Sequence, residues 1–435
     1  MKQTADAIVI GAGIIGAATA FELAKTGRDV VVVDQLPASG YGSTSSSSAI
    51  VRCQYSTVAG SSLAWESYHV WCQWADHVGL TDERGRAEFR EIGCLAIKDA
   101  GNEFLAPVCK VMDHVGIPYA HWDNEAIAAR LPGFDLHRYG PPKRADHPDF
   151  GIASAEFIAG GVYFPNAGYV NDPQLAAYNL QRAAEQAGAQ FRFNIKVTAI
   201  RREADSVRGV TLNDGSEIAA PVVVNVGGPH SRLINDMAGV TGGMNVTSRA
   251  LRKEVCYLPA PTGCGFDDTA PFFADPDTGA YCRPETGNKI VTGSLEPDCD
   301  ALVWVDDVDD FDRAFSDQWT TQAMRLGMRI PTLGIPGQAS GVVDLYDVSD
   351  DWIPIYDRAD LDGFFMACGT SGNQFKNAPV AGAIMAALID AAARGHDHDA
   401  EPLQFELPQT RATLDLAAFS RRRVVNQDSS FSVLG

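Results

Sequence analysis

Two runs of four consecutive apolar residues stand near the N-terminus, at 7–10 and 30–33. Runs of this kind predict strands that are buried on both faces of a parallel sheet. The stretch 14–26 between them predicts a helix, and Gly27 follows at the position where a glycine commonly ends one. The three segments together predict a compact βαβ unit.

Similar patterns return later in the chain. Asp172-Pro173 predicts the start of a helix that stops at Gly188, and Asp214-Gly215 predicts a hairpin turn. The other predicted elements are an alternating, half-buried strand over 191–197, buried strands at 221–226 and 364–367, a helix start at the acidic run 306–310 and a helix over 378–393. The stretches 90–150 and 240–340 are less regular and richer in Pro, Gly and aromatic residues.

The order of these patterns predicts an α/β protein of two intimately joined domains. We expect a doubly wound nucleotide-binding domain made of residues 1–90, 150–240 and 341–435. Residues 91–149 and 241–340 are expected to form an interleaved substrate domain with a mixed β-sheet.

Charge and cysteine content narrow the classes of partner. Fifty-five acidic and thirty-five basic side chains give a formal net charge of −20, which disfavours nucleic acid and anionic membrane surfaces. Nine cysteines, an odd number without a CxxC pair, are expected to be reduced thiols of a cytoplasmic protein. The sequence has no apolar run of about 18 residues that would predict a membrane span, and its N-terminus is not typical of a secretory signal.

Several polar and aromatic groupings have an ordinary structural explanation. The run His396-Asp397-His398-Asp399 predicts a solvated loop after a helix, and no metal site is expected. Trp65, Trp71 and Trp74 recur at near-helical spacing and predict helix packing. The histidines that match no catalytic pattern are His69, His77 and His230.

A glycine pattern directly follows the first predicted strand. In Gly11-Ala12-Gly13-Ile14-Ile15-Gly16 the first glycine permits a tight turn, the second lets the backbone approach a pyrophosphate, and the third lets the helix pack on the strand. Backbone N–H groups at the helix start then face the phosphates. Asp34, eighteen residues after Gly16, can accept hydrogen bonds from ribose hydroxyls. The unit predicts a dinucleotide site, but by itself it does not separate FAD from NAD.

Further motifs follow in a characteristic order. They are the Ser/Thr-rich loop 42–52, the helix region 168–188, the strand end 224–228, the segment 346–355 and the glycine loop 369–376. With these motifs the chain resembles, over almost its whole length, the D-amino-acid oxidase/sarcosine oxidase superfamily of FAD-dependent amine oxidoreductases. It is most similar in style to the sarcosine oxidase and dimethylglycine dehydrogenase side of that superfamily.

The resemblance implies that the nucleotide-binding domain holds FAD between the Ser/Thr-rich loop and the glycine loop. The implied cofactor residues are Gly11, Gly13, Ile14, Ile15, Gly16, Asp34, Ser43, Thr44, Ser45, Ser46, Ser47, Val197, Gly227, Gly369, Gly372, Asn373, Gln374, Phe375 and Lys376. Monomeric sarcosine oxidases carry a flavin-bound cysteine just before the position of Tyr346, but 342–345 holds none here, so we expect noncovalent FAD. Val291 aligns with the lysine that assists oxygen in those relatives, and Lys289 lies two residues away, which favours an acceptor other than oxygen.

The resemblance also implies a substrate site with Arg52, Lys376 and Tyr281 as its main residues. An arginine fork suits a planar carboxylate, and Lys376 would add a second positive charge. Other readings stay open. Arg52 could be a structural ion-pair partner, Lys376 a solvated residue at a helix start, and Tyr281, with Arg283, part of ordinary strand packing.

The expected reaction is oxidation of the C–N bond of an amino acid, at a secondary or N-methylated amine, by hydride transfer to flavin N5 with an imine as product. Oxygen, a quinone or an electron carrier would accept the electrons, and the protein could form an oligomer. Three alternatives remain: a 2-hydroxy acid dehydrogenase, a catalytic subunit of a larger complex, and a module that carries FAD structurally.

Overall fold

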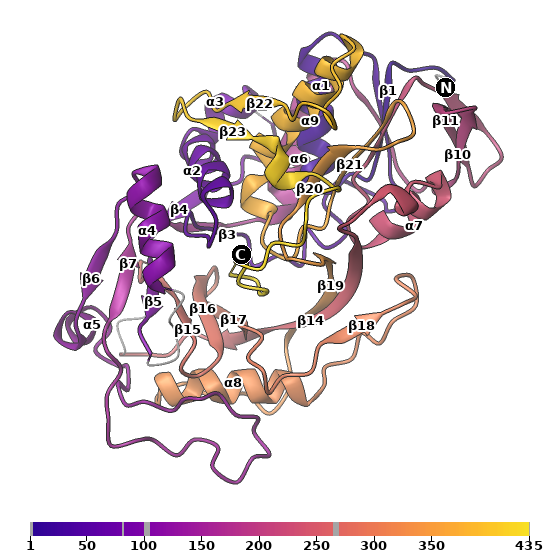
Figure 1. The fold of residues 1–435 in the computed structure, drawn as a ribbon. Helices are drawn as coiled ribbons and strands as arrows, with labels where there is room; N and C mark the ends of the chain where they lie inside the picture. Colours follow the sequence, from indigo (N-terminus) through magenta and orange to yellow (C-terminus); the bar gives the residue numbers. More distant parts are fainter. Residues whose placement is uncertain (1–2, 81, 100–104, 264–268, 435) are drawn as a thin grey trace.

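A six-stranded sheet forms the centre of the nucleotide-binding domain (Figure 1). The computed structural model describes residues 3–80, 82–99, 105–263 and 269–434. The strand order is β20-β21-β13-β1-β2-β9, and all neighbours are parallel except β20 and β21. In this order the strands span Ile355–Arg358, Phe364–Cys368, Val222–Asn225, Ala7–Ile10, Val30–Val33 and Gln190–Arg192. The predicted βαβ unit and the buried strands near 222 and 364 are therefore confirmed.

Both faces of this sheet are buried, which explains why its strands read as unbroken apolar runs. Val9 and Val32 pack against three helices, α1, α6 and α9. Ile8 and Val31 face the opposite way, toward a three-stranded antiparallel sheet and α7. The face that carries Ile8 and Val31 is thus covered mainly by strands, whereas an ideal doubly wound domain has helices on both faces. The covering elements are α1 Ile14–Lys25, α6 Pro173–Gln186, α7 Ser231–Ala238, α9 Ala378–Ala393, β10 Val197–Glu203, β11 Ser206–Leu212 and β12 Glu217–Ala219.

Local signals placed most of these elements correctly. The Asp172 side chain accepts a hydrogen bond from the Leu175 N–H at 2.9 Å and so begins α6 as predicted. The predicted strand over 191–197 is wrong as a single element, because Asn194 has φ +59° and divides it between β9 and β10. The acidic run 306–310 does not begin a helix either; the nearest helix, α8, begins at Asp317 behind the capping residue Ser316.

The second domain is a nine-stranded mixed sheet with α8 (Asp317–Arg329) on one face. Its path is β18-β14-β17-β16-β15-β5-β7-β6, and β19 pairs with β14 along its length. β7 and β19 belong to this sheet, although they lie outside the segments 91–149 and 241–340. The second domain therefore includes more of the chain than those two segments. The strands are β5 Cys94–Ile97, β6 Ala120–Trp122, β7 Gly161–Phe164, β14 Ser248–Pro259, β15 Phe272–Asp275, β16 Ala280–Glu285, β17 Lys289–Ser294, β18 Val303–Val305 and β19 Gly341–Ser349.

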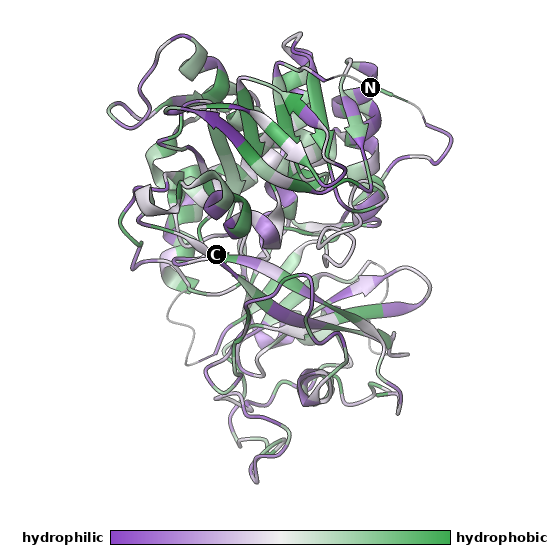
Figure 2. Cartoon of the chain, turned by 90° about the vertical axis from the view of Figure 1, so that its right-hand side faces the viewer, coloured by the Kyte–Doolittle hydropathy of each residue, from purple (hydrophilic) through white to green (hydrophobic). Residues whose placement is uncertain are grey.

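Smaller helices and strands complete the structure. Apolar positions, green in Figure 2, concentrate on the strands of the upper, nucleotide-binding part and thin out toward the loops. The remaining elements are α2 Val58–Cys72, α3 Trp74–Val78, α4 Leu105–Val115, α5 Asn124–Arg130, β3 Ile50–Val51, β4 Phe89–Glu91, β8 Gly168–Val170, β22 Gln404–Glu406 and β23 Thr413–Asp415. In the described part of the chain, no helix combines the length and apolarity needed to cross a bilayer.

Buried ion pairs hold parts of the fold that the sequence assigned to the surface. The loop 396–399 is one of them: Arg421 binds Asp399 at 2.8 Å and Asp357 at 3.1 Å, and His398 is buried beside them. The prediction of a fully solvated loop is therefore wrong for His398 and Asp399. The described residues contain no group of three or more His, Cys, Asp or Glu side chains placed to hold a metal ion.

Gly382 sets the distance between α9 and α1. A Cβ atom at this position would lie 2.6 Å from the backbone carbon of Ala18, which cannot yield as a side chain can. We predict that Gly382→Val lowers the free energy of unfolding by about 1–3 kcal/mol through overpacking, as measured by chemical denaturation. The control Gly242→Val, where a Cβ meets nothing within 4 Å, should change it by less than about 0.5 kcal/mol. Equal stability of the two variants would contradict this account of the helix contact.

Candidate active site

The turn between β1 and α1 requires two of its glycines for steric reasons. Gly11 has φ +112°, and a Cβ there would lie 2.4 Å from the carbonyl oxygen of Val226. A Cβ on Gly16 would lie 2.0 Å from the carbonyl oxygen of Gly11. At Gly13 the nearest atom would be the Thr44 hydroxyl, at 3.2 Å. Because Gly13 has no side chain, its backbone is accessible on the side that faces Thr44 and the cavity beyond Thr44.

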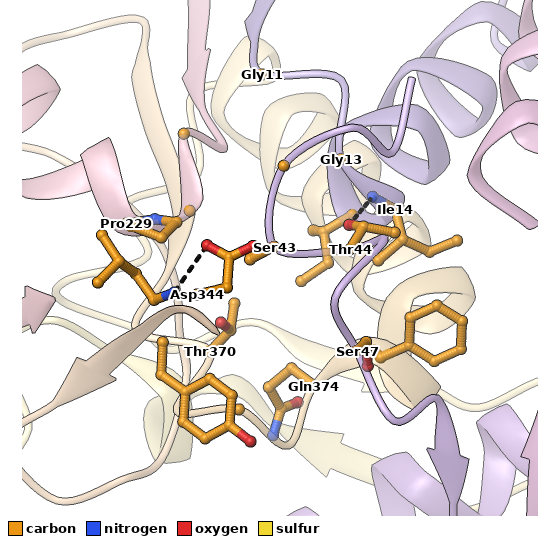
Figure 3. Close-up of a pocket in the computed structure, with 18 of the residues that line it drawn as sticks. Gly11, Gly13, Ile14, Ser43, Thr44, Ser47, Pro229, Asp344, Thr370 and Gln374 are labelled. Carbon is orange, nitrogen blue, oxygen red and sulfur yellow. Dashed lines mark hydrogen bonds between the residues drawn. The ribbon is translucent and has the colours of Figure 1, made fainter. Parts of the chain in front are cut away.

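The Ser/Thr-rich loop covers the start of α1 (Figure 3). Thr44 Oγ1 accepts a hydrogen bond from the Ile14 N–H at 3.1 Å. An oxygen thus already occupies the position at which the helix N-terminus attracts a phosphate oxygen. Gly13, which has no side chain, leaves room beside this helix start for the pyrophosphate of a dinucleotide.

Asp34 lies at the end of β2 and lines the same cavity. Its two carboxylate oxygens accept hydrogen bonds from the Ala12 N–H at 2.6 Å and the Leu36 N–H at 2.8 Å. Burial raises the pKa of this carboxyl, while the two backbone donors oppose the rise. Asp34 therefore fixes the glycine turn in addition to facing the position predicted for the ribose.

The cavity has a volume of about 590 Å³ and runs between the two domains. A volume of this size is ordinary for a site that encloses a cofactor or a small ligand. Of the residues that sequence analysis proposed for cofactor and substrate, those that line it are Gly11, Gly13, Ile14, Ile15, Gly16, Asp34, Ser43, Thr44, Ser47, Arg52, Val197, Gly227, Tyr281, Gly372, Asn373, Gln374, Phe375 and Lys376.

Three proposed residues do not line the cavity: Ser45, Ser46 and Gly369. Each fixes a loop instead. The Ser45 hydroxyl donates to the Gly42 carbonyl at 2.9 Å, and the Ser46 hydroxyl donates to Asp344 at 2.6 Å. The Gly369 N–H donates to the buried carboxylate of Asp347 at 2.6 Å.

Some cavity residues escaped sequence analysis. Asp344 lies where Figure 3 shows the Ser/Thr-rich loop approaching the glycine loop. At the other end, Asp309 binds His230 at 2.8 Å and Lys196 at 2.7 Å, and these partners lower its pKa to about 2. His230 thus has a partner after all. Only the folded chain brings these distant segments together, and no local pattern marks them.

Arg52 is 5% exposed and faces the cavity. Its guanidinium donates to the carbonyl of Gln54 and, at 2.7 Å, to that of Val433, and it lies 4.5 Å from the centre of the Tyr55 ring. Among the described residues no carboxylate pairs with it. The alternative in which Arg52 is a structural ion-pair partner therefore finds no supporting carboxylate among these residues.

Lys376 is 3% exposed, so the alternative of a solvated residue at a helix start is wrong. Its ammonium donates to the Tyr55 hydroxyl at 2.9 Å and to the Asn373 carbonyl at 2.5 Å. Burial, followed by the nearby charge of Arg52, holds the pKa of Lys376 well below its usual range. An anion entering the cavity would restore the charged form.

The tryptophan pattern supports this lysine. Trp71 and Trp74 are buried as predicted, and their rings stack with centroids 4.3 Å apart. The Trp71 indole N–H also donates to the Lys376 carbonyl at 2.7 Å, and its ring stacks on Phe375. Helix packing by α2 and α3 thus fixes the glycine loop from behind.

Tyr281 faces the cavity because residues alternate on the strands of the large sheet. On β15 and β16, Phe273 and Cys282 point toward α8, whereas Ala274 and Tyr281 line the cavity. The Tyr281 hydroxyl lies 2.8 Å from the Ser48 hydroxyl, and burial raises its pKa to about 12. The phenol is therefore neutral at physiological pH and acts as a hydrogen-bonding group.

Three other residues weighed from the sequence stay outside the cavity lining: Arg283, Lys289 and Val291. Arg283 donates to the Ser48 carbonyl at 2.6 Å and pairs with Glu285 at 2.8 Å, so it supports the Ser/Thr-rich loop. Val291 is buried in β17, and Lys289 is exposed at the start of that strand. The cations that line the cavity are Arg52, Lys196, Arg313 and Lys376.

The sequence matches the family described as FAD dependent oxidoreductase over residues 6–388. The chain belongs to this family. A probable sarcosine oxidase of Arabidopsis thaliana is 24% identical over 256 residues, which are 58% of this chain and 55% of the plant protein. N-methyl-L-tryptophan oxidase of Yersinia pestis (strain Pestoides F) is 27% identical over 226 residues, 51% of this chain and 53% of that protein. The match thus spans about half the length of these curated relatives.

Solved structures agree with the fold of this family member. L-proline dehydrogenase from P. horikoshii superposes with a TM-score of 0.74 at 20% identity, over 91% of this chain and 95% of the other. Glycine oxidase from Geobacillus kaustophilus also gives 0.74 at 20% identity, over 98% of this chain and 100% of the other. At this identity the comparison establishes the fold, and the mixed α/β architecture with its nucleotide-binding domain is confirmed.

Gly13 offers a test of the cofactor site. We predict that Gly13→Val yields a folded protein with little bound FAD, because the new side chain meets Thr44 and fills the space beside the helix N-terminus. Flavin content, read from the visible spectrum, should fall while the secondary structure persists. The thermal midpoint should also fall because the ligand's contribution to stability is lost. Full flavin occupancy in this variant, equal to that of Gly242→Val, would contradict the assignment.

Proposed function

We propose that this chain oxidises the C–N bond of an amino acid that carries a secondary or N-methylated amine. One observation carries the proposal: two buried basic side chains, Arg52 and Lys376, line the cavity without a carboxylate partner among the described residues. Buried charges are costly unless they are paired, so the site is completed by an anionic ligand. The names of two relatives, a probable sarcosine oxidase and an N-methyl-L-tryptophan oxidase, support an N-methyl amino acid as the substrate.

Arg52 and Lys376 would bind the substrate carboxylate. The guanidinium fork matches the two oxygens of a carboxylate, and the Lys376 ammonium adds a charge-assisted hydrogen bond from the glycine-loop side. Tyr55 fixes Lys376 through its hydroxyl, which also donates to the Asn373 carbonyl at 2.8 Å. The clamp would therefore hold the acid end of the substrate in one orientation.

Two polar atoms next to the clamp can recognise the rest of the substrate. Gln54 Oε1 and Asn373 Nδ2 are buried without a hydrogen-bond partner among the described residues, and both side chains line the cavity. Buried polar atoms of this kind usually have a partner in the functional state. Gln54 Oε1 would accept a substrate N–H, and the positive charge of Arg52 would favour the neutral amine over the ammonium. The amine then keeps the lone pair that C–N oxidation requires.

Bound FAD would supply the hydride acceptor, and the imine product would be hydrolysed by water. The residues placed to hold the cofactor are the glycine turn 11–16, the Ser/Thr-rich loop and the glycine loop. Oxygen, a quinone or an electron carrier would reoxidise the enzyme. Each domain would contribute one wall of the enclosed site, because residues of both domains line the cavity.

We further propose that FAD is bound without a covalent link. The segment 342–345 presents Asp344 and Leu345 to the cavity and contains no cysteine. Cys94 does line the cavity, but its thiol is buried, and this burial raises its pKa to about 12. The thiolate needed for attachment is therefore disfavoured at neutral pH.

Acid precipitation tests the mode of attachment. The yellow colour should pass entirely into the supernatant, because nothing but hydrogen bonds and packing would hold the cofactor. The measurement is flavin absorbance in both fractions. Colour that stays with the pellet would mean that another residue, with Cys94 the first candidate, has formed a bond to the flavin.

The carboxylate clamp makes a quantitative prediction. Removing one partner of a desolvated charged pair costs roughly 2–5 kcal/mol, so Arg52→Ala should lower kcat/KM for a carboxylate substrate by about ten- to a thousandfold. Arg52→Lys should recover only part of this loss, because an ammonium lacks the fork. FAD content should stay close to normal in both variants.

The decisive comparison uses an N-methyl amino acid and its amide. Arg52→Ala should erase most of the preference of the unmodified enzyme for the acid, whereas Arg232→Ala, at an exposed position on α7, should keep it. A preference that survives in Arg52→Ala would refute the clamp. If 2-hydroxy acids reduced the flavin and amines did not, the substrate would be a 2-hydroxy acid and the proposed amine oxidation would be wrong.

A further inference from the structure

The C-terminal segment enters the candidate active site. Val433 and Leu434 line the same cavity as Arg52, Lys376 and Tyr281. In Figure 1 and in the rotated view of Figure 2 the C-terminal end lies between the nucleotide-binding domain above and the large sheet below. A segment of this chain thus occupies part of the space assigned to the substrate.

The backbone of Val433 is held by charged groups on both sides. Its carbonyl accepts the 2.7 Å hydrogen bond from Arg52, and its N–H donates to Glu296 at 3.3 Å. Glu296 is itself paired with Lys253. The Val433 carbonyl therefore takes the position at Arg52 that the proposed carboxylate clamp reserves for a substrate oxygen.

The side chains of Val433 and Leu434 have an apolar seat beside this contact. They pack against a cluster formed by Ala274, Tyr281, Leu295 and Ile50. A carbonyl on the arginine and branched aliphatic groups next to it reproduce the features of an apolar amino acid. The segment shows which ligand shape this part of the cavity accepts.

Upstream of the cavity, buried polar contacts attach the C-terminal region to the nucleotide-binding domain. Asp351 binds Arg423 at 2.7 Å, and the Ser429 hydroxyl donates to the Asp351 carbonyl at 2.6 Å. Among the described residues beyond Ser429, Val433 makes two hydrogen bonds to the rest of the molecule. Phe431 has φ +48°, a strained conformation for a residue with a side chain. Few contacts and local strain favour release of 430–434 as a unit.

We propose that residues 430–434 are an internal competitor for the carboxylate subsite at Arg52, and that this subsite takes carboxylic acids with an aliphatic side chain. The inference rests on the carboxylate clamp of the proposed function. A ligand would bind only to the fraction of molecules in which the segment has left Arg52. If the segment is seated in about nine molecules out of ten, the apparent affinity falls about tenfold.

Binding of 3-methylbutanoate tests the proposal, because this acid has an aliphatic chain but no C–N bond to oxidise. Its Kd is measured by isothermal titration calorimetry on the flavin-loaded protein, with and without residues 430–435. We expect binding about tenfold tighter after the deletion, with unchanged FAD content. Acetate, which lacks the aliphatic group, should bind the shortened protein more weakly than 3-methylbutanoate, and 3-methylbutanamide should bind neither protein.

A second variant keeps the full chain. Val433→Gly combined with Leu434→Ala removes the apolar contacts of the segment and should shift the Kd in the same direction by about three- to tenfold. Val424→Gly is the matched control, since Val424 belongs to the same C-terminal region but is 86% exposed, and its Kd should equal that of the unmodified protein. This full-length variant decides the question if the deletion prevents folding.

The possible failures are distinct. Equal Kd values with and without the segment would overturn the internal competitor and leave the clamp intact. Weaker binding after deletion would overturn it as well, and would make the segment a wall of the site. If neither protein bound the acid, the carboxylate clamp would be refuted, and the internal competitor, which depends on the clamp, would be refuted as well. Equal affinity for acetate and 3-methylbutanoate in the shortened protein would overturn the aliphatic subsite.

Discussion

The close approach of α1 to the end of β1 sets the positions of the residues at the cofactor end of the cavity. Gly16 lies against the Gly11 carbonyl, and Gly11 lies against the Val226 carbonyl, at distances that leave no room for a Cβ atom. These contacts fix the helix start relative to β1 and β13. The first amide of the helix, the Ser/Thr-rich loop and Asp34 are positioned from there, so the cofactor end of the site depends on backbone contacts between distant segments.

The other end of the cavity depends on burial of charge. Arg52 and Lys376 come from loops more than three hundred residues apart, yet Tyr55 contacts both of them. Packing by the α2 and α3 tryptophans holds the glycine loop in place, and the large sheet supplies Tyr281. The hydrogen bonds of these two basic groups go to backbone carbonyls, including that of Val433, and to the Tyr55 hydroxyl. The proposed function uses the same donors for a substrate carboxylate.

The interleaving of the domains gives this arrangement its rigidity. Strands β5, β7 and β19 leave the nucleotide-binding part, join the large sheet and return. Two of these strands contribute to the cavity wall, β5 through Cys94 and β19 through Asp344, Leu345 and Tyr346. Asp344 on β19 shows the effect, because it meets Ser46 across almost three hundred residues of sequence. The six-stranded and nine-stranded sheets share no strand, so the chain segments that run between them carry the connection of the two domains.

The sequence by itself determined the nucleotide-binding unit, because its signals are local: apolar runs for doubly buried strands, glycines where a Cβ cannot fit, and Asp172 as a helix cap. It also indicated the family through the order of its loops. It could not show that Asn194 would divide a strand, that the acidic run 306–310 would pair with His230 and Lys196, or that His398 would be buried. Only the tertiary structure decided which charges meet, and only there does Val433 reach Arg52. Contacts between segments that are far apart in the sequence produce no local pattern. The residues around each partner are compatible with its secondary structure whether or not the distant partner is present.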